Sequence, residues 1–211
     1  YDLMNDLMSF GLHRIWKKNL INMMNPGKNK ILADVACGTA DLAKQFLDNS
    51  DKNNKVYCID PNKEKIKKGK DKLIKYENIN WLIGSAESLP LKDNSCDYYI
   101  ISFGLRNTKD LNKSISEAYR VLKTGGRYFC LEFSKIQNVG LEFIYKKYTK
   151  IIPDIGKYVV GEKHPYEYLI KSIEDFINQE ELLELIKFQK FENCTYRNLS
   201  GGVVAIHSGW K

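Results

Sequence analysis

The stretch that most constrains this chain is residues 30–42, KILADVACGTADL. It opens with a short apolar run that closes on Asp34, and a compact turn of small residues follows, which contains Gly38 and Thr39. From Asp41 onward, apolar residues recur at helical spacing. A strand, a turn of small residues and a helix make the first unit of a Rossmann-like α/β sheet. Such a turn lets a ligand approach backbone N–H groups at the amino end of the helix.

The turn does not match the dinucleotide-binding fingerprint G-x-G-x-x-G, because Ala36 and Asp41 stand where that fingerprint has its first and last glycines. An acidic residue ahead of one turn glycine is instead similar to the arrangement in S-adenosylmethionine (SAM) methyltransferases. A second apolar run, residues 55–59, ends at Asp60, whose carboxylate can accept hydrogen bonds from both ribose hydroxyls of an adenosine. The alternative is that Asp60 only caps a helix that begins near Pro61.

The rest of the chain continues the alternation of strands and helices. The predicted elements are strands at 79–83, 96–101, 127–133, 191–197 and 203–208, and helices at 111–122 and 179–187. Residues 123–126 are interpreted as a turn that ends in Gly-Gly. The last two strands are close enough in sequence to pair as an antiparallel hairpin, which is how the seven-stranded methyltransferase sheet ends. We therefore expect one Rossmann-like α/β domain of the class I SAM-dependent methyltransferase type over residues 1–211.

Two segments stand outside this alternation. Residues 1–25 suggest short helices that can fold over the open carboxyl edge of the sheet as a lid, or an amphipathic helix packed elsewhere on the sheet. Residues 139–173 form an aromatic, basic insertion that is long for a connection between a strand and a helix. We interpret this insertion as helices that wall a substrate pocket.

Composition narrows the class of protein. The chain has 211 residues with a hydrophobic share of 43% and a charged share of 28%, as expected for a soluble globular domain with a sizeable core. No apolar run approaches the roughly 18 residues of a membrane span. The net charge is +7, and many lysines lie in residues 63–75. We interpret them as the solvated face of a helix and expect no nucleic-acid partner, because no aromatic residues interleave with these lysines.

The cysteines and the first residue bear on the compartment. The five cysteines form an odd set without a CxxC pair, so we interpret them as reduced thiols and expect no metal site. The chain begins at Tyr1 without Met, and we expect that a natural N-terminal segment has been trimmed. Together with the lysine-rich composition, this favours the matrix side of the mitochondrial inner membrane, and the bacterial cytoplasm is the alternative.

Two more loops follow predicted strands at the carboxyl edge. Ser85 and Ala86 come after the third strand, where small residues suit the edge of an adenine ring. Residues 102–107, SFGLRN, follow the fourth strand, beside the first strand if the strand order switches there. Ligands of open α/β sheets bind at such a switch point.

Three stretches resemble the UbiE-like ubiquinone/menaquinone biosynthesis C-methyltransferase family: residues 1–9 with 13–17, residues 102–107, and residues 120–126 through 131–134. The resemblance covers essentially the whole chain. It implies that a methyl group passes from SAM to a ring carbon of a polyprenylated benzoquinol or naphthoquinol. Together with Asp34 and Gly38 of the turn, it implies that SAM is held at Thr39, Asp60, Ser85, Ala86 and Ser102.

The chemistry of the acceptor points to further residues. A ring carbon is a poor nucleophile unless the neighbouring hydroxyl loses its proton, so the site needs a group that favours phenolate and a route for the proton. Arg106 can stabilise phenolate but stays protonated; the alternative is a salt-bridged scaffold residue. Asn107 can orient a ring oxygen. The base is a water, Asp2, His13 or the second oxygen of the substrate, although a lone histidine more often has a structural role.

The expected activity is that of a 2-methoxy-6-polyprenyl-1,4-benzoquinol methylase, with a demethylmenaquinone methyltransferase as the alternative. A subunit that binds quinone lipid or scaffolds a biosynthetic complex is a third alternative from a different class. Expected partners are a polyprenyl quinol, a membrane surface contacted through residues 139–173 and the basic surface, a quinone-biosynthesis complex and a second copy of the chain.

Overall fold

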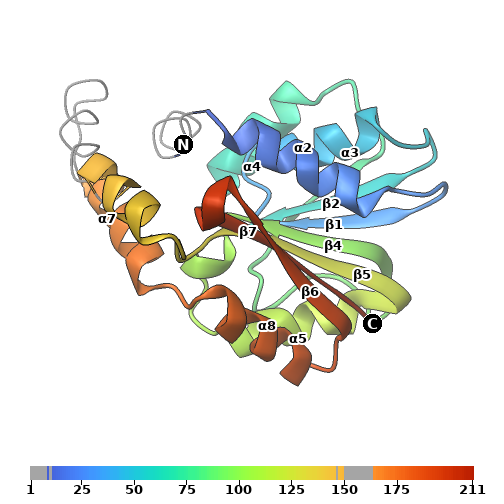
Figure 1. Ribbon diagram of the computed structural model, residues 1–211. Helices are drawn as coiled ribbons and strands as arrows, with labels where there is room; N and C mark the ends of the chain where they lie inside the picture. Colours follow the sequence, from blue (N-terminus) through green and yellow to red (C-terminus); the bar gives the residue numbers. More distant parts are fainter. Residues whose placement is uncertain (1–8, 10, 146, 150–163) are drawn as a thin grey trace.

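The computed structural model describes residues 9, 11–145, 147–149 and 164–211. A seven-stranded sheet runs through the molecule in the order β3-β2-β1-β4-β5-β7-β6, with helices on both faces (Figure 1). This is the Rossmann-like arrangement of class I SAM methyltransferases that the sequence predicts. Among the helices of the described ranges, none is long and apolar enough to cross a membrane.

The strands are β1 (Ile31–Val35), β2 (Lys55–Asp60), β3 (Ile79–Ile83), β4 (Cys96–Ser102), β5 (Leu122–Phe133), β6 (Glu192–Leu199) and β7 (Val204–Trp210). The helices are α2 (His13–Met24), α3 (Asp41–Asp48), α4 (Lys63–Lys72), α5 (Leu111–Val121), α7 (His164–Asp175) and α8 (Gln179–Phe188), with 3₁₀ turns η1 (Leu105–Asn107) and η2 (Ser200–Gly202). Residues 139–145 and 147–149 are also helical.

Strands β1 to β5 run parallel, whereas β7 pairs antiparallel with β5 on one side and β6 on the other. The predicted terminal hairpin is therefore confirmed. Parallel strands covered on both faces need apolar side chains on both, which explains why β1 and β4 are mostly apolar in sequence. The order of the sheet reverses between β1 and β4, so a crevice opens where the carboxyl ends of these two strands diverge.

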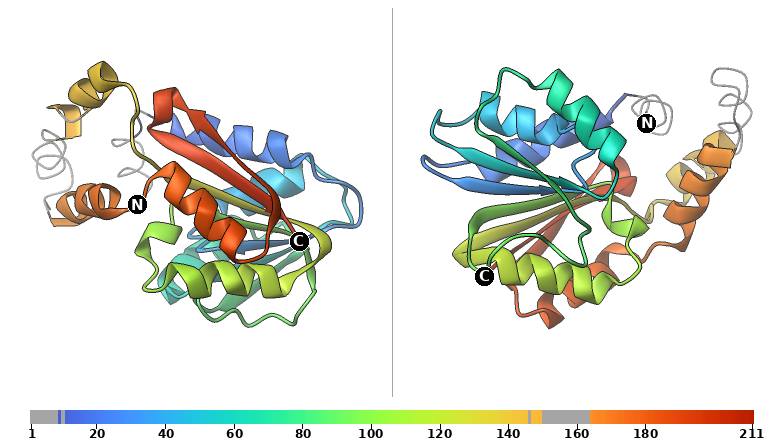
Figure 2. Two further views of the ribbon diagram at one scale, coloured as in Figure 1. Left: turned by 60° about the horizontal axis from the view of Figure 1, so that its bottom comes forward. Right: turned by 180° about the vertical axis from the view of Figure 1, so that it is seen from behind.

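Helices α2 and α3 cover one face of the sheet, and α5 and α8 cover the other (Figure 1, Figure 2). The indole of Trp16 packs against the rings of Phe103 and Phe133 and donates a hydrogen bond of 2.9 Å to the Ser200 hydroxyl. Helix α2 thus packs on the sheet, as in the second of the two predicted placements. Residues 1–8 of the predicted lid lie outside the described residues.

The prediction of a separate turn at residues 123–126 is wrong, because β5 begins at Leu122 and runs through that segment. Its backbone pairs with the end of the chain, where Gly125 N–H donates to the Lys211 carbonyl and Lys211 N–H donates to the Gly126 carbonyl. Gly125 has a φ of 75°, a conformation that glycine adopts at little cost. Because Lys211, more than eighty residues away in the sequence, pairs with Gly125 and Gly126, this segment belongs to a strand and not to a separate turn.

The aromatic insertion forms helices, as predicted, in the part that the structure describes. Residues 139–145 and 147–149 are helical, and these residues and α7 extend away from the sheet (Figure 1, Figure 2). The lysine-rich stretch forms α4, in which Ile66 and Gly69 are the buried residues and the lysines face outward.

Candidate functional site

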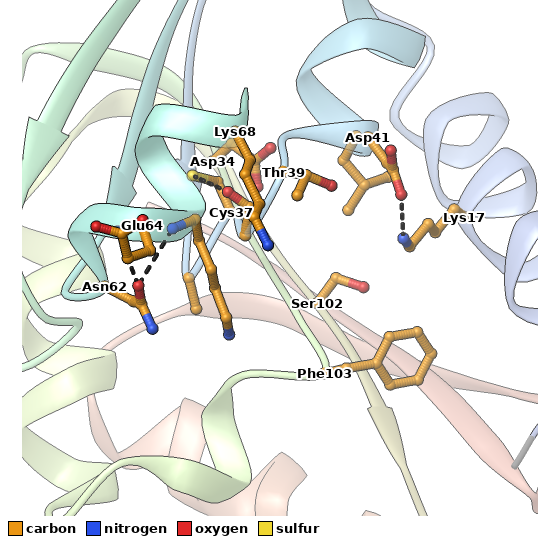
Figure 3. Close-up of a pocket in the computed structure, with 14 residues that line it drawn as sticks. Lys17, Asp34, Cys37, Thr39, Asp41, Asn62, Glu64, Lys68, Ser102 and Phe103 are labelled. Carbon is orange, nitrogen blue, oxygen red and sulfur yellow. Dashed lines mark hydrogen bonds and ion pairs between the residues drawn. The ribbon is translucent and has the colours of Figure 1, made fainter. Parts of the chain in front are cut away.

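A pocket of about 390 Å³ lies at the carboxyl ends of β1 and β4 (Figure 3). Its wall comes from α2, the turn after β1, the first residues of α3 and α4, and the end of β4. Small-molecule sites measure about 300–1,000 Å³, and open α/β sheets hold them at the point where the strand order reverses. The pocket therefore has both the place and the size of a cofactor site.

The turn after β1 has an unusual backbone. Ala36, Gly38 and Ala40 all have positive φ, at 54°, 58° and 61°. Each alanine in this conformation costs about 1–2 kcal/mol relative to the ordinary helical region. A β-carbon built on Gly38 would meet no atom within 4 Å, so the glycine leaves open space beside the pocket. Conformational strain of this kind collects at ligand sites.

Asp34 is the buried acid of the pocket. Asp34 is 2% exposed, and its Oδ2 accepts a hydrogen bond of 3.1 Å from the Ala43 N–H. Burial raises the pKa of the Asp34 carboxyl to about 7, although the Ala43 hydrogen bond and the charge of Lys17 partly oppose the shift. A desolvated carboxyl on the wall of a pocket is suited to a cationic ligand.

Asp60 lies behind the turn. Its Oδ2 accepts from Gly38 N–H at 2.9 Å and its Oδ1 accepts from Asn62 N–H at 2.8 Å. Helix α4 is capped by Asn62, whose side chain accepts from the N–H groups of Glu64 and Lys65. The alternative that Asp60 merely caps this helix is therefore wrong. Its role with a ribose stays a prediction.

The remaining predicted cofactor residues divide into two groups. Thr39 and Ser102 line the pocket, and the Ser102 hydroxyl is buried without a hydrogen-bond partner among the described residues. A buried unpaired hydroxyl facing a pocket indicates a missing ligand. Ser85 and Ala86 follow β3 but do not belong to the pocket wall, and Ala86 is buried in the core beside α5.

Arg106 does not line the pocket. Its side chain is 2% exposed, and its Nη1 lies 2.7 Å from Oε1 of Glu132, whose side chain is equally buried. The same nitrogen donates to the Phe103 carbonyl at 2.7 Å, and Nε donates to the Ser172 hydroxyl at 3.2 Å. This geometry, in which Nη1 and Nε are both bonded within the protein, matches the alternative of a salt-bridged scaffold residue.

The other predicted catalytic residues are not gathered in one place. Asn107 is exposed, and its Oδ1 accepts from the Tyr168 hydroxyl of α7 at 3.2 Å. His13 is 2% exposed in the first turn of α2, where its N–H donates to the Ser9 hydroxyl, and it is not part of the pocket wall. Asp2 lies outside the described residues.

The structure adds two residues that sequence reasoning missed. Lys17 of α2 reaches the pocket and lies 3.1 Å from Asp41. Glu132 near the end of β5 holds Arg106. The available signal for Lys17 was a charged residue four positions from His13, on the face of α2 that is otherwise apolar and buried.

Sequence comparison decides the family. The ubiE/COQ5 methyltransferase family matches the chain over residues 1–211. The chain belongs to this family. The UbiE protein of Rickettsia akari, a ubiquinone/menaquinone biosynthesis C-methyltransferase, is 48% identical over 218 residues, covering 100% of this chain and 88% of that protein. UbiE of Rickettsia bellii strain OSU 85-389 is 47% identical over 219 residues with the same coverage.

Solved structures agree on the fold. A SAM-dependent methyltransferase from Thermotoga maritima aligns with a TM-score of 0.67 at 20% identity, covering 92% of this chain and 87% of the other. One from Aquifex aeolicus has a TM-score of 0.64 at 15% identity with the same coverage. At such identities these structures support the fold alone.

The ubiE/COQ5 chain described here is a SAM-dependent C-methyltransferase of ubiquinone/menaquinone biosynthesis, and its cofactor is SAM, as predicted. The Rickettsia relatives are bacterial. They fit the bacterial alternative and give no support to the mitochondrial location that composition favoured.

Proposed function

We propose that this enzyme methylates a ring carbon of a polyprenylated benzoquinol in ubiquinone biosynthesis, as a 2-methoxy-6-polyprenyl-1,4-benzoquinol methylase. The observation that carries the proposal is full-length membership of the ubiE/COQ5 family in a chain with an intact cofactor pocket at the switch point of its sheet. A naphthoquinol acceptor, as for a demethylmenaquinone methyltransferase, is the second candidate, because the relatives are described for both quinones.

The pocket residues fit SAM. When bound, SAM supplies a methyl group on a positively charged sulfur. Asp34 offers a buried carboxyl to a cation, and the Ser102 hydroxyl offers a buried group that no described residue satisfies. Gly38 and Thr39 give small side chains beside the pocket, and Asp60 is assigned to the ribose. The adenine is assigned to the side of Ser85 and Ala86.

The acceptor is assigned to the loop after β4. The Arg106–Glu132 pair holds this loop. The loop contains Phe103, which lines the pocket and whose backbone has a φ of 54°. Asn107 is exposed beside this loop and can orient a ring oxygen of the quinol. Arg106 then acts by fixing Phe103 and Asn107. The proton of the quinol leaves through a water, Asp2, His13 or the second ring oxygen.

Membrane contact is part of the proposal. A polyprenyl tail is too apolar to leave lipid freely, and the helical segment at 139–145 exposes Val139, Phe143 and Ile144 by 79%, 59% and 65%. The Lys147 ammonium lies 4.4 Å from the centre of the Phe143 ring. Apolar side chains with a lysine among them suit an anionic bilayer, where each lysine adds about 1 kcal/mol.

The acceptor is tested with the purified chain, SAM and two short-tailed quinols, one benzoquinol and one naphthoquinol. Mass spectrometry of the product measures which ring gains a methyl group. Methylation of the benzoquinol at the higher kcat/KM supports the proposal. Preference for the naphthoquinol moves the enzyme to menaquinone synthesis. A chain that binds SAM and methylates neither is a quinone-binding subunit.

Membrane contact is tested by flotation with vesicles that contain phosphatidylserine. The expected result is flotation at low salt, reduced in a Phe143→Ser, Ile144→Ser double variant and by added salt. The matched control is Phe188→Ser, because Phe188 is 77% exposed but belongs to α8, outside the insertion and outside the lysine-rich stretch. Flotation lost equally in this control, or absent at low salt, contradicts the contact.

A further inference from the structure

Helix α2 contributes a lysine to the cofactor pocket that the family resemblance does not assign. Lys17 is 8% exposed as a residue, and its ammonium lies 3.1 Å from Oδ2 of Asp41 on the edge of the pocket (Figure 3). An ammonium has three protons to donate, and among the described residues Lys17 uses one of them. Keeping a cation this far from water is costly unless further partners satisfy it.

The partner of Lys17 is shared with a second lysine. Asp41 also pairs through Oδ1 with Lys72 of α4. Burial by itself would raise the pKa of the Asp41 carboxyl, but Lys17 and Lys72 outweigh burial and lower that pKa to about 2. One fully ionised carboxylate therefore faces two ammonium groups. The group carries a surplus positive charge, and Lys17 is its member on the pocket wall.

The opposite charge lies on the same pocket. The buried Asp34 carboxyl faces the pocket, and the field of Lys17 reaches Asp34, since it opposes the rise of the Asp34 pKa. A pocket with a desolvated acid and an under-neutralised lysine is complementary to an α-amino acid, which carries an ammonium and a carboxylate on one carbon atom. SAM ends in such a group, beyond its sulfonium.

We propose that Lys17 binds the carboxylate of the amino-acid end of SAM, while Asp34 faces its ammonium. Two other lysines are less suited. Lys72 does not line the pocket, and Lys68 lines it but is exposed to solvent, so a contact there is screened and worth little. This inference depends on the cofactor and on no particular quinol, so a change of acceptor leaves it intact.

The test is isothermal titration calorimetry with two ligands that differ in one group: SAM and decarboxylated SAM, which lacks the carboxylate. The variants are Lys17→Met, Lys17→Arg and the controls Lys68→Met and Lys18→Met, the second at an exposed lysine of α2 that does not line the pocket, each checked for folding by circular dichroism. A charge-assisted hydrogen bond is worth about 1.5–3 kcal/mol, so Lys17→Met should bind SAM about 10- to 100-fold more weakly. Decarboxylated SAM should bind to Lys17→Met and to wild type equally.

Three further readings decide the case. Lys17→Arg should keep most of the affinity for SAM, and both control variants should stay within about twofold of wild type, below 0.5 kcal/mol. If Lys17→Met weakens both ligands equally, the lysine only fixes α2 to α3 and the proposal fails. If Lys17→Met does not fold, the test uses wild type and Lys17→Arg instead. Both should then bind SAM more tightly than decarboxylated SAM, and equal binding of the two ligands contradicts the proposal. Loss of that preference in Lys68→Met overturns the proposal.

Discussion

Two buried carboxyl groups near the carboxyl edge of the sheet, those of Glu132 and Asp34, differ in their partners. Glu132 of β5 is 1% exposed, accepts from Arg106 at 2.7 Å and also accepts from the Phe133 N–H at 2.9 Å. Asp34 of β1 is 2% exposed and accepts one backbone hydrogen bond among the described residues, with a pKa raised by burial to about 7. The two side chains are almost equally buried, so what distinguishes them is that Glu132 pairs directly with a cation, Arg106.

The difference separates a structural acid from a binding acid. Glu132 has its cation built into the chain, and that pair holds the loop after β4, to which we assign the acceptor. Asp34 lies beside a pocket, and the ligand assigned to this pocket carries positive charge. Removing a partner from Glu132 should therefore cost stability, whereas changing Asp34 should cost cofactor affinity.

The largest expected effect is on the structural side. Arg106→Ala leaves Glu132 buried and unpaired, which should lower the free energy of unfolding by about 3–5 kcal/mol in urea denaturation. The matched control is Arg120→Ala, because Arg120 pairs with Asp93 and Glu117 at a side-chain exposure of 30%. That control should lose less than about 1 kcal/mol from each pair.

The same variant separates scaffold from direct contact. If Arg106 also touched phenolate, the folded fraction of Arg106→Ala would methylate about 10²–10³ times more slowly and recover in part at higher pH. A scaffold role predicts instead that the rate loss follows the loss of stability and that Arg106→Met combined with Glu132→Leu restores folding. Single-turnover rates across pH distinguish the two.

The next effect is on the binding side. Asp60→Ala removes a carboxylate that is assigned to the ribose and that also ties Gly38 N–H to the start of α4. SAM should bind about 2–4 kcal/mol more weakly, since charge-assisted hydrogen bonds are lost. Calorimetry measures it, and unchanged affinity in a folded variant would rule the assignment out.

Asp34 should make SAM binding depend on pH. Its pKa of about 7 means that the carboxyl takes up a proton as the pH falls, and a neutral acid attracts the cationic cofactor less. Affinity should therefore fall below pH 7 by at most about tenfold per pH unit. Asp34→Asn should bind weakly at all pH values and lose this slope. A slope that persists in Asp34→Asn would show that Asp34 is not the group that causes it.

The raised pKa of Asp34 also makes the stability of the protein without SAM depend on pH. The native Asp34 carboxyl holds a proton between its ordinary pKa of 3.8 and about 7, whereas the unfolded chain releases it. The contribution of Asp34 to the free energy of unfolding should therefore decrease as the pH rises through that window. Urea denaturation of wild type and Asp34→Asn without SAM, from pH 4 to pH 8, gives the difference.

The smallest effect concerns the cap of α4. Asn62→Ala should cost about 1 kcal/mol of stability, because two N–H groups of the first turn lose their acceptor. Asn178→Ala, at the capping box of α8, should cost about the same. Asn62 lines the pocket and Asn178 does not, so only the first variant should also alter SAM affinity. Equal effects of both on affinity would mean that the pocket responds to general loss of stability.

The sequence predicted the framework well, because buried parallel strands appear as apolar runs. Strand β3 has the predicted bounds, and β1 and β2 end close to Asp34 and Asp60 as expected. Features that depend on a contact with residues far away in the sequence were not predicted. The start of β5 depends on pairing with Lys211, and the state of Arg106 depends on Glu132, which is 26 residues away. Local patterns carry no signal for either contact.

The same limit holds for the site. Asp34, Gly38 and Thr39 share one local motif, so their proximity followed from the turn. The Lys17 contact needs α2 to pack on the sheet beside α3, and the pocket wall excludes Ser85 and Ala86 because of the path after β3. Tertiary packing decides both.

The strand order has a consequence for biosynthesis. Strand β7, the last of the seven strands in the sequence, lies between β5 and β6, so β6 has no neighbour in the sheet until β7 has formed. Trp16 bonds to Ser200, 184 residues later, and the same indole packs on Phe103 beside the cofactor pocket. Contacts this far apart in sequence form late. A nascent chain can therefore build the strands and turn that bear Asp34 and Asp60 long before Trp16 and Phe103 reach their final packing.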